Sequence, residues 1–199
     1  MYGRPVTYLP NLYYLTGKEN THRPVWSNGL LKIGCFGSLR VYKNFSTAIA
    51  AAIELTNHLG VQSEIWINSG RNDGAGNIVY NTAKAWTNGL PNITLKEQPW
   101  TSWPDFQRLV ATMNILMQPS YTETFNNVTA DGISQGVASV VGPAIEWVPS
   151  YWVGEPDDSN NVAGVARRLL LDARAPAEGY QALQTYVQTG IQAWKLFLN

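Results

Sequence analysis

Residues 31–70 read LKIGCFGSLRVYKNFSTAIAAAIELTNHLGVQSEIWINSG, and this stretch decides the fold. A short apolar run that ends at Gly37 predicts a strand followed by a turn. The next segment repeats apolar residues such as Phe45, Ile49 and Ile53 at helical spacing, up to the next glycine. The run VQSEIWIN then predicts a second strand. Strand, helix and strand in this order indicate a parallel pair joined by a crossover helix.

The same alternation continues along the chain. The further predicted elements are a helix at 78–87, a strand at 92–98, a helix from Pro104 through Leu109, a strand at 113–120, a helix at 127–135, a strand at 137–142 and a helix at 162–171. Strands that alternate with helices pair in parallel, because each crossover returns the chain to the same end of the sheet. We therefore predict an α/β fold, a Rossmann-like three-layer domain with a mostly parallel sheet.

The two ends of the chain differ from this predicted core, which is expected to span residues 31–175. Residues 1–30 contain three prolines and show no sustained period, so they are expected to form an extended arm or interdomain linker. A helix at 176–199 is expected to cover the flank of the domain or a partner with one apolar stripe. The members of this stripe are Tyr180, Leu183, Val187, Ile191, Trp194 and Leu198.

Composition excludes some classes of protein. The 14 Lys and Arg residues balance the 14 Asp and Glu residues, which argues against a chain-wide field that attracts nucleic acid. Cys35, the single cysteine, lies in an apolar run and is expected to be a buried hydrophobic residue. No stretch reaches the roughly 18 consecutive apolar residues of a transmembrane helix, so we expect a cytoplasmic protein.

Five of the eight tryptophans fall in predicted arm or loop segments: Trp26, Trp100, Trp103, Trp147 and Trp152. Aromatic side chains are common at interfaces and in ligand sites, so these residues are expected to face a ligand or a partner. Packing at the edge of the core is the simpler alternative for any one of them.

The first candidate site segment is GSLRVYKN, residues 37–44, which follows the first predicted strand. Gly37 permits close approach of the backbone to a ligand. Arg40 and Lys43 place two cations near the start of a helix, where N–H groups favour anions. The segment predicts an anion site, and the alternative is a glycine turn with two solvated cations.

The second candidate segment is PSYTETFNNVTADGISQGVASVVG, residues 119–142. In an open parallel sheet, ligands bind beyond the carboxyl ends of the strands, so Glu123 and Asp131 are candidates for one crevice. Carboxylates accept hydrogen bonds from vicinal hydroxyls, and the N–H groups at a helix start favour phosphate. A sugar nucleotide presents both groups. The alternative makes Glu123 a surface residue and Asp131 a helix-dipole partner.

These two segments resemble the C-terminal, donor-binding domain of GT-B glycosyltransferases of the large retaining group 1 family. That family includes sucrose-phosphate, glycogen and lipopolysaccharide glycosyl synthases. The resemblance covers about residues 31–172 and is most specific in the second segment. The family signature is Glu, seven residues, Glu, then a glycine and an apolar strand. Here it reads Glu123, seven residues, Asp131, then Gly136 and VASVVG.

The resemblance implies a role for each matching residue. Arg40 and Lys43 would neutralise the donor diphosphate and stabilise the leaving nucleotide, and Glu123 would orient the hexose hydroxyls. Asp131 would bind the ribose diol, and the exit of the third strand, Glu97 to Trp100, would lie beside the base. The other donor-binding residues implied are Gly37 and Ser38 in the first segment and Thr124, Phe125, Asn126 and Asn127 in the second.

The match departs from the family at four positions. Ser38 stands where the family often has arginine, so Arg40 is expected to serve instead. Asn126 replaces a frequent glycine, Ala138 a frequent proline, and Asp131 shortens the second acid by one methylene. The donor implied is a UDP- or GDP-linked sugar, with no cofactor and no catalytic metal. No His, Cys or carboxylate cluster in the sequence has ligand spacing.

A complete GT-B enzyme has a second domain that binds the acceptor, whereas only the predicted arm precedes residue 31. The resemblance therefore implies that this chain is one half of an enzyme and is catalytically incomplete alone. Its partner would be a missing N-terminal acceptor domain or another chain. Through that missing half the protein would also associate with a membrane surface. Retaining glycosyl transfer to an unknown acceptor is the leading hypothesis. The alternatives are a nucleotide-sugar-binding module or partner subunit without catalysis, and a GT-B-like sugar-nucleotide epimerase or phosphorylase.

Overall fold

The computed structural model describes residues 7–16, 26, 29–69 and 76–199. Most of the polar loop RNDGAG, predicted between the second strand and the following helix, lies outside these residues. None of the described helices is long and apolar enough to cross a membrane.

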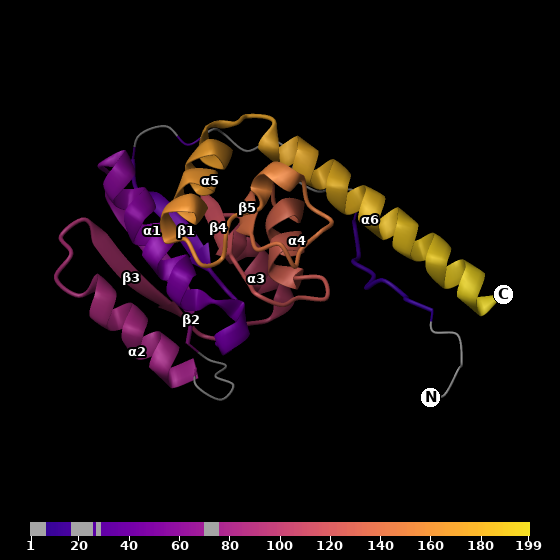
Figure 1. Ribbon diagram of the computed structural model, residues 1–199, viewed down its shortest axis with the longest axis horizontal. Coiled ribbons are helices and arrows are strands. Elements are labelled where there is room, and N and C mark those ends of the chain that lie inside the picture. Colours follow the sequence, from indigo (N-terminus) through magenta and orange to yellow (C-terminus); the bar gives the residue numbers. More distant parts are fainter. Residues whose placement is uncertain (1–6, 17–25, 27–28, 70–75) are drawn as a thin grey trace.

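A five-stranded sheet forms the centre of the domain (Figure 1). Its strands are β1 (Leu31–Cys35), β2 (Ser63–Asn68), β3 (Ile93–Gln98), β4 (Ile115–Gln118) and β5 (Ser139–Val141). They lie in the order β3-β2-β1-β4-β5, and each adjacent pair is parallel. The chain moves outward from β1 to β2 and β3 and then crosses back to β4, so β1 and β4 flank a switch point where ligands bind in such sheets.

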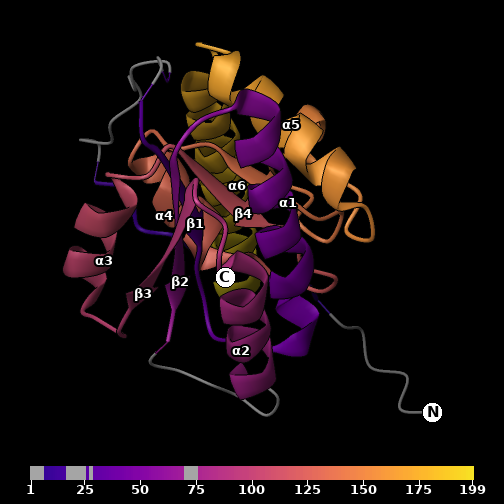
Figure 2. The ribbon, with the colours of Figure 1, turned by 90° about the vertical axis from the view of Figure 1, so that its left-hand side faces the viewer.

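Helices cover both faces of the sheet (Figure 2). On one side lie α1 (Phe45–Leu59), α2 (Gly76–Thr87) and α5 (Ser159–Leu171), and on the other lie α3 (Trp103–Val110) and α4 (Asn127–Ser134), with α6 (Ala175–Leu198) packed against α4. The predicted three-layer α/β fold is confirmed. The sequence did not predict two 3₁₀ turns, η1 (Val41–Lys43) and η2 (Ser150–Trp152).

The core follows from the apolar runs of the central strands. Leu31, Ile33 and Cys35 of β1 are fully buried, as expected for a strand that is covered by helices on both faces. Burial raises the pKa of the Cys35 thiol to about 12. Cys35 therefore behaves as a small buried hydrophobic residue, as the sequence predicted.

The long helix α6 is only partly covered by the domain. Leu183 and Val187 are buried, whereas Ile191 is 38% and Leu198 is 74% exposed. The helix extends past the sheet layers (Figure 1), so the predicted apolar stripe contacts the domain only along its first half. The arm segment 7–16, which contains neither helix nor strand, contacts its second half.

The start of α6 packs tightly on η2. A Cβ atom added to Gly179 would lie 2.4 Å from the ring of Trp152, which is fully buried. Trp152 is therefore a core residue, and the expectation that it faces a ligand or partner is wrong. The indole fits only because glycine occupies position 179.

Gly179→Ala tests this contact, with Gly164→Ala in α5 as the control. Alanine favours a helix interior over glycine by about 1 kcal/mol, but at Gly179 the methyl group must displace a buried indole, which typically costs about 1–3 kcal/mol. At Gly164 the nearest atom is Arg168 Nη1, at 4.0 Å. In urea denaturation we expect Gly179→Ala to lower the free energy of unfolding and Gly164→Ala to raise it. Equal gains for both variants would contradict the tight packing.

Candidate functional site

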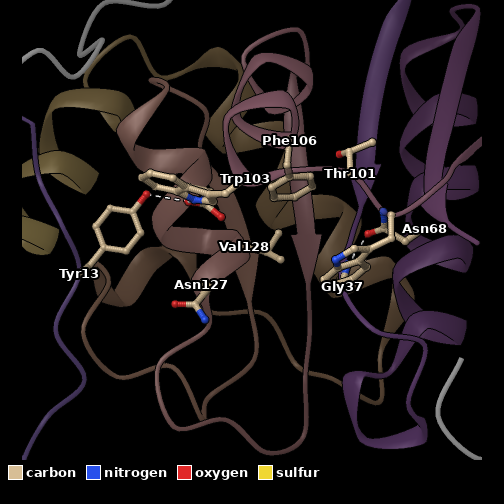
Figure 3. Close-up of a pocket in the computed structure, with 10 residues that line it drawn as sticks. Tyr13, Gly37, Asn68, Thr101, Trp103, Phe106, Asn127 and Val128 are labelled. Atoms are coloured by element: carbon tan, nitrogen blue, oxygen red, sulfur yellow. Dashed lines mark hydrogen bonds between the residues drawn. The ribbon is translucent and has the colours of Figure 1, made fainter. Parts of the chain in front are cut away.

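A cavity of about 380 Å³ opens at the carboxyl ends of the strands (Figure 3). Its volume falls in the range of roughly 300–1,000 Å³ that is typical of small-molecule sites. The residues that line it come from the arm, from the exits of β1, β2 and β3, from α3 and from α4: Tyr13, Gly37, Asn68, Trp100, Thr101, Trp103, Phe106, Asn127, Val128 and Asp131. Aromatic rings therefore share the wall with a few polar groups.

One end of the cavity is formed by the turn after β1. Gly37 has a φ of 124°, which only glycine adopts without strain. Its N–H donates a hydrogen bond of 2.7 Å to Asn68 Oδ1 at the end of β2, and Asn68 Nδ2 donates to the carbonyl of Gln98 at 3.4 Å. These bonds tie the exits of three neighbouring strands together.

Asp131, at the other end of the cavity, is a buried carboxylate surrounded by donors. It is 3% exposed. Its Oδ1 accepts hydrogen bonds from Tyr13 Oη at 2.7 Å, Trp103 Nε1 at 2.9 Å and Gln107 Nε2 at 3.4 Å. Burial raises the pKa of the Asp131 carboxyl, and these three hydrogen bonds oppose that rise because they favour the charged form.

The sequence did not predict several of the residues that line the cavity, namely Tyr13, Asn68, Thr101, Phe106 and Val128. Burial raises the pKa of the Tyr13 phenol, so the hydroxyl stays protonated and can donate to Asp131. Tyr13 lies in the arm, where no apolar period marks a contact with the core. Its bond to Asp131 joins positions 118 residues apart, and no local pattern predicts such a pairing.

A second polar cluster lies at the start of α4. Lys43 Nζ forms an ion pair with Glu123 Oε1. Asn126 Nδ2 donates to the same oxygen at 2.8 Å and to Gln118 Oε1 at 3.2 Å, while its Oδ1 caps the helix by accepting from Thr129 N at 2.8 Å. Asn127, the next residue, lines the cavity. The cluster and the cavity are therefore adjacent.

The two predicted segments are held together by Asn44 at the start of α1. Asn44 is buried and has a left-handed φ of 54°. Its Nδ2 donates to the carbonyls of Pro119, at 3.1 Å, and Pro156, at 2.7 Å. The N–H of Tyr121 also donates to the carbonyl of Tyr42 at 2.9 Å. These bonds fix the loop after β1 against the loop after β4.

The other predicted site residues have different positions. Arg40 and Thr124 are exposed in the two loops, and Ser38 is half-buried. The Phe125 ring is buried and stacks on Trp147 and Tyr186, each at 5.1 Å between ring centroids, so only its backbone can serve a ligand.

Glu97 is not brought to the cavity. Its carboxylate lies 3.2 Å from Lys84 Nζ of α2 and lines a separate hollow with residues of that helix. From the predicted strand exit, Trp100 does line the cavity, together with the next residue, Thr101.

The loop tryptophans divide into two groups. Trp100 and Trp103 line the cavity, as the sequence analysis expected of residues that face a ligand. Trp147 stacks on Phe125, and Trp26 packs against the core.

In the part of the chain that the structure describes, no group of three or more His, Cys, Asp or Glu side chains could hold a metal ion.

Of the comparisons with known proteins, the one with solved structures bears on the fold. No protein-family model and no curated protein match the sequence. Among solved structures, the C-terminal domain of the glycosyl transferase group 1 family protein LpcC from Francisella tularensis is similar with a TM-score of 0.65 and 17% identity. The match covers 80% of this chain and 85% of that domain.

Two larger enzymes contain a domain of similar fold as part of a longer chain. Sucrose-phosphate synthase from Thermosynechococcus elongatus has a TM-score of 0.64 at 19% identity and covers 84% of this chain, which spans 45% of the synthase. A UDP-forming trehalose-phosphate synthase from Burkholderia xenovorans has a TM-score of 0.64 at 12% identity, over 84% of this chain and 43% of that one. The chain thus has the fold of the C-terminal domain of GT-B glycosyltransferases and spans less than half of these two synthases.

Asp131→Asn tests the state of the buried acid. Because the pKa of the Asp131 carboxyl is raised in the folded state, the folded protein binds the carboxyl proton more tightly than the unfolded chain does. The free energy of unfolding therefore falls as the pH rises from the ordinary aspartate pKa of about 3.9 through the raised value. Asparagine stays neutral and still offers an oxygen to Tyr13 and Trp103. We expect similar melting temperatures for the variant and the wild type near pH 4, and a higher melting temperature for the variant at pH 7.5.

The matched control is Glu146→Gln, which removes one negative charge from an exposed loop residue. It should leave the pH dependence of the melting temperature unchanged. A stability difference between Asp131→Asn and wild type that is constant from pH 4 to pH 7.5 would show that the carboxyl does not titrate as its burial implies.

Proposed function

We propose that this domain binds a nucleoside diphosphate sugar and is the donor-binding half of a retaining glycosyltransferase. One observation carries the proposal. An aromatic cavity with a buried carboxylate at Asp131 adjoins a charged cluster, Lys43 and Glu123, at the start of α4. A nucleoside diphosphate sugar has a flat base, a ribose diol, two phosphates and a hexose, and each of these groups has a chemical counterpart in this arrangement.

The nucleoside would occupy the cavity. Indole rings such as those of Trp100 and Trp103 offer flat apolar surfaces for a base, which is worth about 1–3 kcal/mol per stacked base in nucleic-acid complexes. The ribose hydroxyls would donate to Asp131. Within the predicted strand exit, this assignment gives the base contact to Trp100 and not to Glu97, which is paired with Lys84, and it adds Trp103.

The diphosphate would lie between the first loop and the start of α4. Arg40 and Lys43 supply positive charge, and backbone N–H groups of residues 124–127 lie where a helix N-terminus favours anions. Gly37 and Ser38 allow the backbone to approach. When the bond between the sugar and the diphosphate breaks, negative charge grows on the leaving nucleotide, and these cations stabilise it. The proposal assigns no step to a metal or cofactor.

Glu123 would then accept hydrogen bonds from the hexose hydroxyls. In the free domain its Oε1 already accepts from Lys43 and Asn126, so the carboxylate is oriented before a sugar arrives. The acceptor hydroxyl would attack from the face that the diphosphate leaves. Groups that bind the acceptor would come from a second domain or chain.

The solved structures of the same fold support the choice of donor to test first. One is a UDP-forming trehalose-phosphate synthase, and another was studied for glycosyl transfer with retention. We therefore choose UDP and UDP-linked sugars as the first ligands, with GDP and ADP as competitors.

Titration calorimetry tests donor binding. We expect the wild type to bind UDP, and Lys43→Met to weaken binding about tenfold to hundredfold, because a charge-assisted hydrogen bond to phosphate contributes about 1.5–3 kcal/mol. Lys84→Met is the matched control, since it also removes a lysine from an ion pair with a glutamate, but away from the cavity. If UDP, GDP, ADP and their sugars all fail to bind, the donor site does not exist.

Turnover separates an enzyme from a binding module. The proposed mechanism takes the acceptor from a second domain, so we expect this chain alone to bind a sugar nucleotide without transferring or rapidly hydrolysing its sugar. Product can be followed by liquid chromatography of released UDP. Transfer to an added acceptor by the isolated chain would contradict the proposal that a second domain or chain binds the acceptor.

A further inference from the structure

The arm segment 7–16 supplies part of the cavity wall through Tyr13. The phenol is 9% exposed, and its hydroxyl donates to Asp131 Oδ1 at 2.7 Å. The Tyr13 hydroxyl oxygen also accepts a hydrogen bond from Gln107 Nε2 at 3.3 Å and lies 3.4 Å from Ser134 Oγ. Figure 3 shows Tyr13 at one end of the cavity and Gly37 at the other, with Asn127 and Val128 between them.

Tyr13 is held in place by contacts other than its bond to Asp131. Its ring packs against Phe125, with 6.0 Å between centroids. Along the arm, Trp194 Nε1 donates to the carbonyl of Pro10 at 2.8 Å. At Gly190 an added Cβ would lie 3.2 Å from Leu12 Cδ2, so α6 has a glycine where the arm crosses it. The position of the phenol is thus fixed by α6 and the core.

The hydrogen bonds from Tyr13, Trp103 and Gln107 all meet the same carboxylate oxygen, Oδ1. An ionised carboxylate has two oxygens and about four acceptor positions. Donors fixed on Oδ1 restrict rotation of the short Asp131 side chain, so they also determine where Oδ2 lies. A ligand that approaches Asp131 therefore meets an acceptor whose direction has been set beforehand.

We propose that Tyr13 is a positioning residue for Asp131, which it orients to accept hydrogen bonds from the ribose diol of the nucleotide. This inference rests on the proposed function. Tyr13 lines the cavity and does not fill it, since a volume of about 380 Å³ remains with the phenol in place. Through Tyr13, the arm therefore forms part of the wall of the proposed nucleotide site.

Tyr13→Phe tests the inference, and Tyr14→Phe is its control. Tyr14 is the next residue of the same arm, and it is 75% exposed. The two probes are UDP and 2′,3′-dideoxy-UDP, which lacks the ribose diol. We expect Tyr13→Phe to weaken UDP binding about fivefold to tenfold, because Asp131 loses a donor that favours its charged, oriented form, and to leave dideoxy-UDP binding unchanged. Tyr14→Phe should change neither affinity.

A double-mutant cycle with Asp131→Ala, which removes the acceptor oxygens, shows whether Tyr13 acts through the carboxylate. In the Asp131→Ala background, Tyr13→Phe should no longer affect UDP binding. Equal losses in both backgrounds, or equal losses for both probes, would overturn the inference and indicate a structural role for the arm. Tighter UDP binding by Tyr13→Phe would overturn it as well, because it would show that the phenol competes with the ligand.

The wild type separates this inference from the proposed function. If wild-type protein binds neither probe, the proposed donor site fails and the role of Tyr13 fails with it. If the wild type binds UDP more tightly than dideoxy-UDP and Tyr13→Phe keeps that preference, the inference alone fails.

Discussion

The candidate site depends on the hydrogen bonds of two asparagines at helix starts, Asn44 and Asn126. They are the two non-glycine residues with positive φ in the described part of the chain. Both are buried. The Asn44 side chain joins loops that are distant in sequence, whereas the Asn126 side chain holds Gln118 and Glu123 of its own segment. Asparagine tolerates this conformation better than other side chains do, yet the conformation still opposes folding. Residues held in this way are typical of sites where geometry matters more than stability.

The same two residues explain why the two segments act as one unit. Asn44 begins the helix after the first loop and bonds to Pro119 at the start of the second. Asn126 begins α4 and bonds to Glu123, the partner of Lys43. The two helix starts are therefore held in fixed relation before any ligand is present. Such preorganisation lowers the entropic cost of binding an anionic ligand, because the two loops need not become ordered when it binds.

The strands and helices could be predicted because each depends on apolar patterns within about 20 residues. Asp131 lines the cavity, and helical spacing fixes which residues of α4 share that face; its role in binding stays a prediction. Glu97 was expected at the base because it ends a strand, but its side chain is directed to Lys84 of α2. Tyr13 and Trp152 depend on where α6 packs, and no local pattern contains that information.

Asp131 connects the stability of the domain to its candidate function. A buried carboxylate destabilises the folded state unless donors surround it, and here the donors come from the arm and from α3. An apolar residue at this position would avoid the desolvation penalty, but it would take the carboxylate acceptor away from the Tyr13 hydroxyl and the Trp103 indole N–H. The carboxylate and its donors therefore stabilise the fold only when all of them are present. A ligand whose hydroxyls also donate to Asp131 would contact a site that the arm, α3 and α4 form together.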